Sequence, residues 1–168
     1  SNYSTYEEIA QVLAIPVGTV RSRLAAAREK LLAYYNRSVD ASDDAIKEAI
    51  QWSDYYHHLC NKLYHDWENR KEFIEHFDPM LNIRFTSGKL AQGRPLFEKE
   101  INEDLNCGTF FKVNTITSSG NISVIEGYSN NSPEYPDRCP PSSVLIMFRE
   151  NGKVDTLHLI NSPKVIDK

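Results

Sequence analysis

Asp54 and His58 lie four positions apart and are the residues of this sequence best spaced to move a proton. In a helix, residues at i and i+4 share a face, and a carboxylate beside an imidazole is the usual unit for proton abstraction. The apolar stripe of the same stretch, however, turns Tyr56, Leu59 and Leu63 inward, so Asp54 and His58 belong on the exposed side. We therefore expect a surface pair and no catalytic residue.

Other reactive side chains lack the spacing of a metal site, a cofactor site or an activated nucleophile. The cysteines Cys60, Cys107 and Cys139 are far apart and offer neither a Cys-x-x-Cys pair nor a set of zinc ligands. Gly-x-Ser-x-Gly, P-loop and His-Glu-x-x-His motifs do not occur in the sequence. We expect no metal, no cofactor and no enzymatic activity.

A cluster of aromatic and aliphatic residues between positions 52 and 67 has two interpretations. At helical spacing such a cluster more often forms a hydrophobic core. It could instead line a pocket for a small-molecule ligand. The candidate pocket residues are Trp52, Tyr56, Leu59, Leu63 and Trp67.

The composition is that of a globular protein. The chain has 168 residues, of which 40% are hydrophobic and 25% are charged, enough for one domain of ordinary size or two small ones. Its longest apolar runs, such as Val144–Phe148, are far shorter than the roughly 20 residues that a membrane span needs. The first residues do not resemble a signal peptide, so we expect a cytoplasmic protein without a membrane partner.

Charge is distributed unevenly between two parts of the chain. Residues 1–38 contain five Lys and Arg against three acidic residues, whereas the remaining residues contain 14 basic and 20 acidic side chains. The polar stretch from Asn36 to Asp44 interrupts the helical pattern. We therefore place a domain boundary after Ser38 and predict a small basic unit joined to a larger acidic one.

The basic unit, residues 1–38, is predicted to be a helix-turn-helix. Ile9, Ala10 and Leu13 have helical spacing, and Ser4 or Thr5 is a suitable cap for that first helix. Pro16 then disfavours a helical Ile15 while suiting the start of a second helix. That second helix has one apolar stripe and basic residues on its other sides. The stripe consists of Val20, Leu24, Ala27 and Leu31.

The stretch from Tyr6 to Leu24, YEEIAQVLAIPVGTVRSRL, closely resembles the promoter-reading end of region 4 in sigma-70 family factors. The nearest likeness is to the extracytoplasmic-function group, in which this segment reads the upstream promoter element. The resemblance implies that the second helix enters the major groove and that its first residues lie at the base edges. It places Thr19, Arg21, Ser22 and Arg23 at the DNA, and Arg28 and Lys30 nearer the phosphates.

Residues 39–168 predict an α+β domain. Helical periodicity runs from Ile46 to Trp67, and a second helix follows from about Glu68 to Phe77. Asp78-Pro79 should end that helix before a strand over Met80–Phe85, and Arg94-Pro95 should open a third helix. Two hairpins then complete the domain, with a long surface loop between them. Their strands are expected at Thr109–Thr117, Ile122–Tyr128, Val144–Arg149 and Val154–Ile160, and the loop at Ser129–Ser143.

This order resembles the SnoaL-like branch of the nuclear-transport-factor-2-like superfamily over residues 42–162. The resemblance implies a cone in which three helices pack on a curved mixed sheet. Two short segments are also similar to motifs of the group. These are Thr86-Ser87-Gly88-Lys89 and Asn161-Ser162-Pro163-Lys164-Val165. Some extracytoplasmic-function sigma factors carry such a domain, where it resembles a built-in regulator.

Together these features predict a regulator of transcription initiation, either a C-terminal fragment or a truncated relative of an extracytoplasmic-function sigma factor. Its partners would be promoter DNA and either the RNA polymerase core or another sigma factor domain, with a small-molecule ligand as a further option. The alternative is a SnoaL-like enzyme or ligand-binding protein with a helical appendage. In the first case, we expect the acidic domain to restrain the basic unit by direct contact. The contact surfaces would be the acidic run Glu98–Asp104 and the loop Ser129–Ser143.

Overall fold

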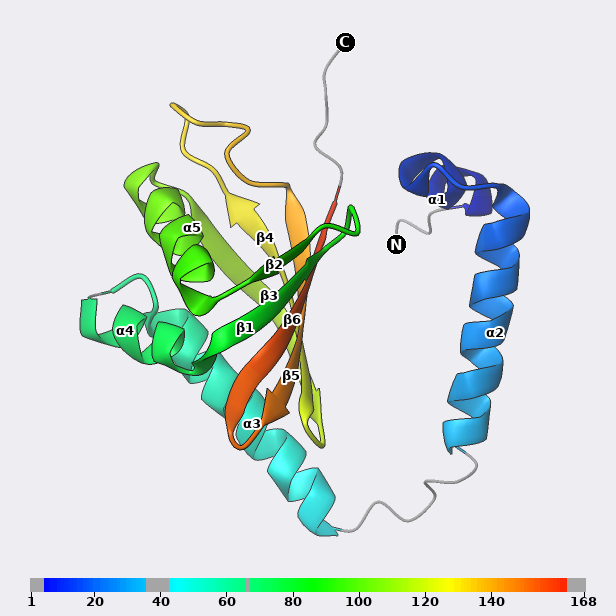
Figure 1. Ribbon diagram of the computed structural model, residues 1–168, viewed down its shortest axis with the longest axis horizontal. Coiled ribbons are helices and arrows are strands. Elements are labelled where there is room, and N and C mark those ends of the chain that lie inside the picture. Colours follow the sequence, from blue (N-terminus) through cyan, green and yellow to red (C-terminus); the bar gives the residue numbers. More distant parts are fainter. Residues whose placement is uncertain (1–4, 36–42, 66, 163–168) are drawn as a thin grey trace. The chain divides into compact units, whose positions relative to one another are not determined.

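The computed structural model describes residues 5–35, 43–65 and 67–162, and the chain divides into two compact units, Ser1–Ser42 and Asp43–Lys168 (Figure 1). The boundary expected after Ser38 falls between the described ranges. No helix in these ranges is both long enough and apolar enough to cross a membrane.

The N-terminal unit is a helix-turn-helix of α1 (Tyr6–Leu13) and α2 (Val17–Tyr35). Thr5 caps α1 through a capping box: its Oγ1 accepts from the Glu8 amide at 3.1 Å, and its own amide donates to Glu8 Oε2 at 2.6 Å. Ala14 ends the helix in the left-handed conformation, with φ of 51°. The turn therefore joins the two helices through only three residues, as the sequence predicted.

Little of this N-terminal unit is buried. Ala10 of α1 and Val20 of α2 are 6% and 3% exposed. Farther along the predicted apolar stripe, Leu24 is half-buried and Leu31 is 67% exposed. The reason is length, because the eight residues of α1 span only about 12 Å and α2 is more than twice as long.

The C-terminal unit packs three helices on one face of a curved six-stranded sheet (Figure 1). The helices are α3 (Asp43–Lys62), α4 (Trp67–Glu75) and α5 (Arg94–Asn106). The strands are β1 (Phe77–Phe85), β2 (Leu90–Gln92), β3 (Phe110–Ser119), β4 (Ile122–Asn130), β5 (Ser142–Glu150) and β6 (Lys153–Asn161). Their order is β2-β1-β6-β5-β4-β3, and β1 pairs with β6 in parallel while all other pairs are antiparallel. The predicted α+β cone with a mixed sheet is thus confirmed.

Both predicted hairpins form. In the second, Asn151 and Gly152 have φ of 52° and 78°, the positive values that a tight two-residue turn between β5 and β6 requires. In the first, Gly127 of β4 makes room for the Phe111 ring, because a Cβ there would lie 2.6 Å from Phe111 Cζ. Gly127 thereby lets Phe111 reach the inner face of the sheet.

The structure differs from the sequence prediction around Asp78-Pro79. These residues do not precede the first strand but lie inside β1, which begins at Phe77. The pairing of β1 with β6 shifts between Phe77 and Asn82, so this irregular stretch accommodates a proline that has no amide hydrogen to donate. The short strand β2 was not predicted either, since its three residues are too few to show a period.

The core of the C-terminal unit lies between the helices and the inner face of the sheet. It is formed by Tyr56, Leu59, Leu63, Phe73, Ile74, Phe77, Leu81, Ile83, Ile125, Leu145, Met147, Val154 and Leu157.

Candidate functional site

The basic residues of α2 form the candidate nucleic-acid interface. Arg23, Arg28 and Lys30 are exposed, and none of them has an ion pair among the described residues. Thr19 and Arg23 are one turn apart, and Lys30 follows two turns after Arg23, so these three share one face of α2. They lie off the face that buries Val20, and are therefore placed to meet a ligand outside the unit.

Arg21 differs from these residues because it also contacts α1. Its Nη2 lies 3.6 Å from Glu7 Oε1, and its guanidinium lies over the Tyr6 ring at 5.7 Å from the centroid. Ser22 is also engaged within the unit, since its Oγ donates to the Thr19 carbonyl at 3.1 Å. Arg21 thus helps to fix the angle between the two helices, while its side chain stays 62% exposed.

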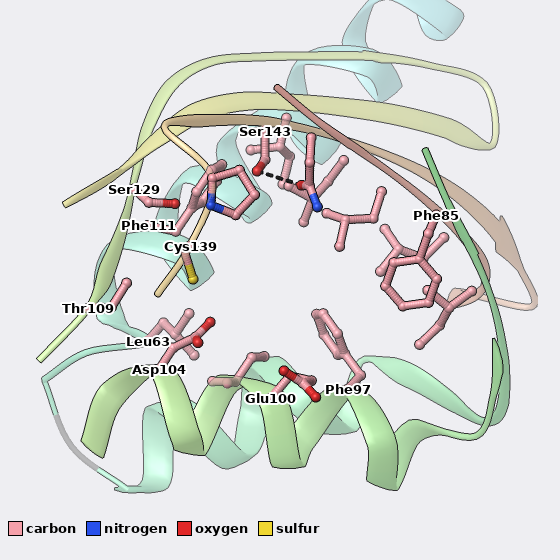
Figure 2. A pocket seen from close by; sticks show the side chains of 18 of the residues that line it. Leu63, Phe85, Phe97, Glu100, Asp104, Thr109, Phe111, Ser129, Cys139 and Ser143 are labelled. Atoms are coloured by element: carbon pink, nitrogen blue, oxygen red, sulfur yellow. Dashed lines mark hydrogen bonds between the residues drawn. The ribbon is translucent and has the colours of Figure 1, made fainter. Parts of the chain in front are cut away.

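The second candidate site is a cavity of about 460 Å³ inside the C-terminal unit (Figure 2). Its walls are the inner face of the sheet, the helix α5 and the end of α3. Most of the lining is apolar, and Phe85, Phe97 and Phe111 bring aromatic rings to it. The size and the apolar lining are those of a small-molecule site.

Polar groups gather at one edge of this cavity, where the ends of β1 and β6 meet. Thr86 Oγ1 donates to the Leu159 carbonyl at 3.2 Å and accepts from the Asn161 amide at 2.7 Å. Lys89 and Asn161 both line the cavity beside this junction. The first residues of the two short segments singled out in the sequence, Thr86 and Asn161, are therefore neighbours in the fold, while residues 163–165 of the second segment lie outside the described residues.

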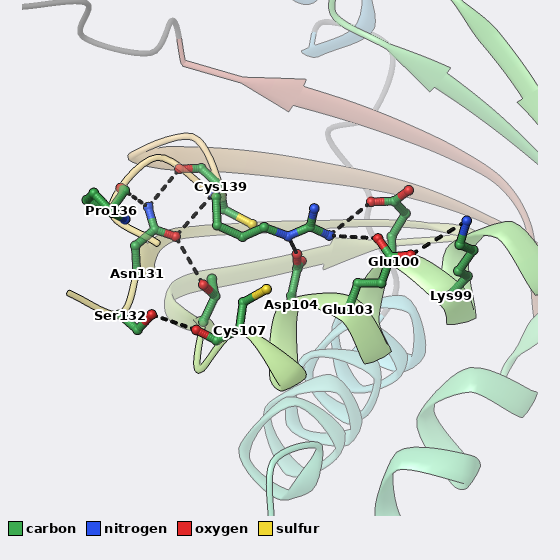
Figure 3. A network of polar contacts seen from close by, with 11 residues as sticks. Lys99, Glu100, Glu103, Asp104, Cys107, Asn131, Ser132, Pro136 and Cys139 are labelled. Carbon is green, nitrogen blue, oxygen red and sulfur yellow. Dashed lines mark hydrogen bonds and ion pairs between the residues drawn. The ribbon is translucent and has the colours of Figure 1, made fainter. Parts of the chain in front are cut away.

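Residues 131–141, which we name the strap, connect β4 to β5 and form another part of the cavity wall (Figure 3). Arg138 of the strap reaches α5, where its Nε donates to Asp104 Oδ1 at 2.7 Å. Its Nη2 lies 3.4 Å from Glu100 Oε2 and 3.3 Å from Glu103 Oε2. One guanidinium thus holds the strap against three carboxylates.

Hydrogen bonds to the backbone fix the strap at its other end. Asn131 Nδ2 donates to the carbonyls of Pro136 and Cys139 at 2.8 and 2.9 Å, and its Oδ1 accepts from the Cys139 amide. Ser132 Oγ donates to the Cys107 carbonyl at 2.6 Å. The long loop expected over Ser129–Ser143 is therefore ordered against α5. It joins the predicted acidic run Glu98–Asp104, so the two surfaces form one.

The predicted pocket residues do not form this cavity together. Leu63 lines it, whereas Tyr56 and Leu59 are fully buried in the core and Trp67 is 57% exposed. Trp52 lies over Arg149, with the guanidinium 4.0 Å from the ring centroid, and stacks on Tyr56. Periodicity identified the inward face of α3, but not which inward residues border open space.

Away from this cavity, a buried polar network surrounds Arg149 and His76. Arg149 is 5% exposed, and donates to Ser123 Oγ at 2.5 Å and to the Gly120 carbonyl at 2.6 Å. Tyr56 Oη lies 2.7 Å from His76 Nε2. Burial, followed by the charges of Arg149 and Lys153, lowers the pKa of His76 to about 4, so the imidazole is neutral near pH 7.

Asp54 and His58, which were expected to lie on the surface, are not part of the cavity lining. Both are exposed on α3.

Of the cysteines, Cys60 and Cys139 line the cavity. Burial raises the pKa of the Cys60 thiol to about 12, which keeps it protonated and unreactive at neutral pH. Among the described residues no group of His, Cys, Asp and Glu is arranged to hold a metal ion.

Sequence reasoning missed Arg138 and its carboxylate partners as a unit. Arg138 and Asp104 are 34 positions apart, and no local pattern announces a pairing of that range. Lys89 and Asn161 did carry a signal, through the two short motif-like segments to which they belong. Their junction at the cavity edge became visible only in the fold.

Comparison with known proteins agrees with this division into two units. Residues 4–31 match the family model for sigma-70, region 4, which covers α1 and most of α2. No curated protein matches the chain.

Solved structures resemble the C-terminal unit. A candidate ketosteroid isomerase from Kribbella flavida DSM 17836 is 11% identical, covers 72% of this chain and 84% of its own, and has a TM-score of 0.55. A candidate SnoaL-like polyketide cyclase from Jannaschia sp. CCS1 is 17% identical, covers 66% and 85%, and has a TM-score of 0.51. An epoxide hydrolase of the LEH-like type from M. tuberculosis is 11% identical, covers 68% and 85%, and also has a TM-score of 0.51.

At these identities the likeness concerns the fold and not the activity. The match to sigma-70 region 4, in contrast, rests on the amino-acid sequence of residues 4–31. The chain therefore joins a sigma-70 region 4 helix-turn-helix to a domain with the SnoaL-like, nuclear-transport-factor-2-like fold.

Proposed function

We propose that the chain acts in transcription initiation, as a relative of extracytoplasmic-function sigma factors. The observation that carries the proposal is the region 4 match over residues 4–31, which coincides with the capped α1, the left-handed turn at Ala14 and the exposed basic face of α2. Region 4 supports promoter DNA and RNA polymerase as partners, with another sigma factor domain as the alternative to the polymerase core. The site of action would be the cytoplasm.

In this proposal the first turns of α2 enter the major groove. Thr19, Ser22 and Arg23 read base edges, and Arg28 and Lys30 contact phosphates farther along the helix. Arg21 has a structural role as well as a proposed role at the DNA, because it contacts Glu7 and Tyr6 of α1. Its replacement would therefore disturb the angle between the helices as well as any contact with DNA.

Arg23→Ala in the full chain is the direct test, with a promoter fragment followed by fluorescence anisotropy at several salt concentrations. A base-edge contact predicts a loss of about 1–3 kcal/mol of binding free energy, whereas Lys30→Ala should lower the slope of log affinity against log salt by about one. Lys47→Ala, a change of an equally exposed cation in the C-terminal unit, serves as the control. Unchanged affinity and slope in both α2 variants would show that α2 does not read DNA.

The second part of the proposal is that the C-terminal unit modulates the N-terminal unit, and does so negatively, by contact. The support is the opposite sign of the two parts of the chain and the joined surface of α5 and the strap. Arg138 and Lys99 offset part of the acidic run there by pairing with Glu100, Glu103 and Asp104, but the run contains four acidic residues against these two cations. Salt screens such charges beyond about 10 Å, so packing has to supply the remainder of the contact.

We also propose that the C-terminal unit works without catalysis. Asp54 and His58 are exposed and are not part of the cavity lining, and the carboxylates of Glu100 and Asp104 are paired with Arg138. A screen of isomerase and hydrolase substrates tests this. Turnover that Asp54→Asn or His58→Gln abolishes would establish an enzyme instead.

A further inference from the structure

We propose that a surface groove beside the N-terminal half of α3 binds a small aromatic carboxylate. The carboxylate accepts hydrogen bonds from His76 and Tyr55, and the ring packs against Trp52. This groove shares no lining residue with the cavity. The site is independent of DNA binding by α2, so its test needs no promoter.

Side chains of α3 form one wall of the groove. Four of them have the spacing i, i+3, i+4 and i+7, which places them on one face of the helix. His76, directly before β1, and Gly152 of the turn between β5 and β6 complete the lining. The groove has a volume of about 420 Å³, which is enough for a ligand with one ring. The four residues of α3 are Glu48, Gln51, Trp52 and Tyr55.

Two aromatic rings form the apolar part of the groove. Trp52 and Tyr55 are nearly perpendicular, with an angle of 83° between their planes and 5.7 Å between their centroids. Arg149 and Tyr56 contact the Trp52 ring, which fixes its position before any ligand arrives. A ligand ring can therefore pack against one aromatic side chain and meet the edge of the other, without the cost of ordering them.

A chain of hydrogen bonds orients the imidazole of His76. Burial raises the pKa of Tyr56 to about 12, and a hydrogen bond from Arg149 lowers this pKa by a smaller amount. Because Arg149 can only donate, the Tyr56 oxygen accepts from it, and the Tyr56 hydroxyl donates to His76 Nε2 at 2.7 Å. The imidazole is neutral near pH 7, so its own hydrogen lies on Nδ1. Nδ1 is the nitrogen closer to Tyr55 of the groove wall.

His76 Nδ1 and the Tyr55 hydroxyl remain available as donors. The two atoms are 3.5 Å apart, which is at the outer limit of a hydrogen bond, and neither has another partner among the described residues. A carboxylate has two acceptor oxygens on one carbon, so it can accept from both groups at once. These two donors thus favour a carboxylate over a ligand with a single acceptor.

The buried charge beside the groove also favours an anion. Arg149 is 5% exposed, lies 4.0 Å from the Trp52 centroid and has no ion pair among the described residues. Burial is the largest cause of the low pKa of His76, and the charges of Arg149 and Lys153 follow, so both charges act at this position. A bound carboxylate would supply the counter-ion that Arg149 lacks.

Two acidic side chains act against an anion. Glu48 lines the groove, and Glu72 of α4 adds to the rise in the pKa of Tyr55 that burial causes. Both glutamates are exposed, so water and salt weaken their repulsion, whereas the charge of Arg149 is shielded from solvent. Glu48 should therefore reduce the affinity for the carboxylate without preventing binding.

The ligand para-nitrobenzoate is a suitable probe, because it is an aromatic carboxylate whose nitro group quenches tryptophan fluorescence. Trp67→Phe leaves Trp52 as the single tryptophan of the chain. In this variant we expect saturable quenching with one-to-one stoichiometry. Para-nitrobenzamide has the same shape without the charge and should bind roughly tenfold or more weakly. Acetate, which has no ring, should not compete at equal concentration.

Substitutions in the Trp67→Phe chain test the two sides of the charge argument. Tyr55→Phe removes one donor and should weaken binding of para-nitrobenzoate by roughly threefold to tenfold. Glu48→Gln removes a like charge and should strengthen binding by roughly threefold. Glu126→Gln, a change of an exposed acid on β4 that does not line the groove, serves as the control and should leave the affinity unchanged.

A measurement on the unaltered chain keeps the proposal falsifiable if a variant fails to fold. Nuclear magnetic resonance of the imidazole rings should show that para-nitrobenzoate shifts the signals of His76 and not those of His58 or His158, which do not line the groove. Absence of saturable quenching, equal binding of the amide, or an unshifted His76 signal would overturn the proposal. Unchanged affinity in both folded variants, Tyr55→Phe and Glu48→Gln, would overturn it as well.

Discussion

The two units of this chain place their functional groups in opposite locations. In the N-terminal unit, Ala10 and Val20 are the described buried residues, and the side chains with a proposed role stand on the surface of α2. In the C-terminal unit, a large core supports an internal cavity, and the side chains that line this cavity point inward. A DNA-binding surface needs only a scaffold that fixes the angle between two helices. A cavity needs a domain that is rigid enough to keep the cavity open.

Truncation of a core side chain should lower the unfolding free energy much more in the C-terminal unit than in the N-terminal unit. Phe77, at the junction of α4 and β1, is fully buried, and Phe77→Ala should lower the unfolding free energy of the C-terminal unit by about 3–5 kcal/mol. Val20→Ala should cost the N-terminal unit only about 1–2 kcal/mol, since it removes two methyl groups from a small contact. Both tryptophans belong to the C-terminal unit, so their fluorescence during urea unfolding reports on that unit alone. A clear shift of that transition by Val20→Ala would contradict the separation of the cores.

Substitution of Arg149 tests whether the stability of the C-terminal unit depends on this buried cation. Arg149→Met removes the hydrogen bonds to Ser123 and Gly120 and the contact with Trp52, and should cost about 2–4 kcal/mol. Arg149→Lys keeps the charge but not the forked geometry, so it should recover only part of the loss. Thermal unfolding followed by circular dichroism gives both values. Full stability in Arg149→Met would mean that apolar packing alone stabilises the region around residue 149.

His76 should make the C-terminal unit sensitive to mild acid. Its pKa is about 4 in the folded chain, against about 6.5 when unfolded, so the unfolded state takes up a proton first as the pH falls. The unfolding free energy should therefore decrease between about pH 6.5 and pH 4, by at most about 1.4 kcal/mol for each pH unit. Urea unfolding at several pH values should show this decrease in His158→Gln and not in His76→Gln. The same slope in both variants would assign it to other groups.

The sequence predictions were accurate where the interacting residues are close together along the chain, and less accurate where they are far apart. The cap of α1, expected at Ser4 or Thr5, the turn before Pro16 and the Asn151-Gly152 hairpin are local, and each was predicted from neighbouring residues. The strand around Asp78-Pro79 was not, because the parallel partner β6 holds it and lies far along the chain.

The candidate sites follow the same rule. The basic face of α2 is a property of one helix, and its residues could be named from periodicity and resemblance. The cavity depends on volume left between α5 and the sheet, which no pattern of residue types measures. Even so, Leu63 was named, and Lys89 and Asn161 lie in segments that the sequence had singled out.

Restraint of a DNA-reading N-terminal unit by the C-terminal unit can be tested by a comparison of DNA affinities. Residues 1–42 are fused to an unrelated folded carrier protein, their helicity is confirmed by circular dichroism, and the fusion and the full chain are titrated with one promoter fragment at one salt concentration. We expect the fusion to bind more tightly than the full chain, and an Arg23→Ala fusion to lose this gain. Equal or weaker binding by the folded fusion would contradict restraint by the C-terminal unit.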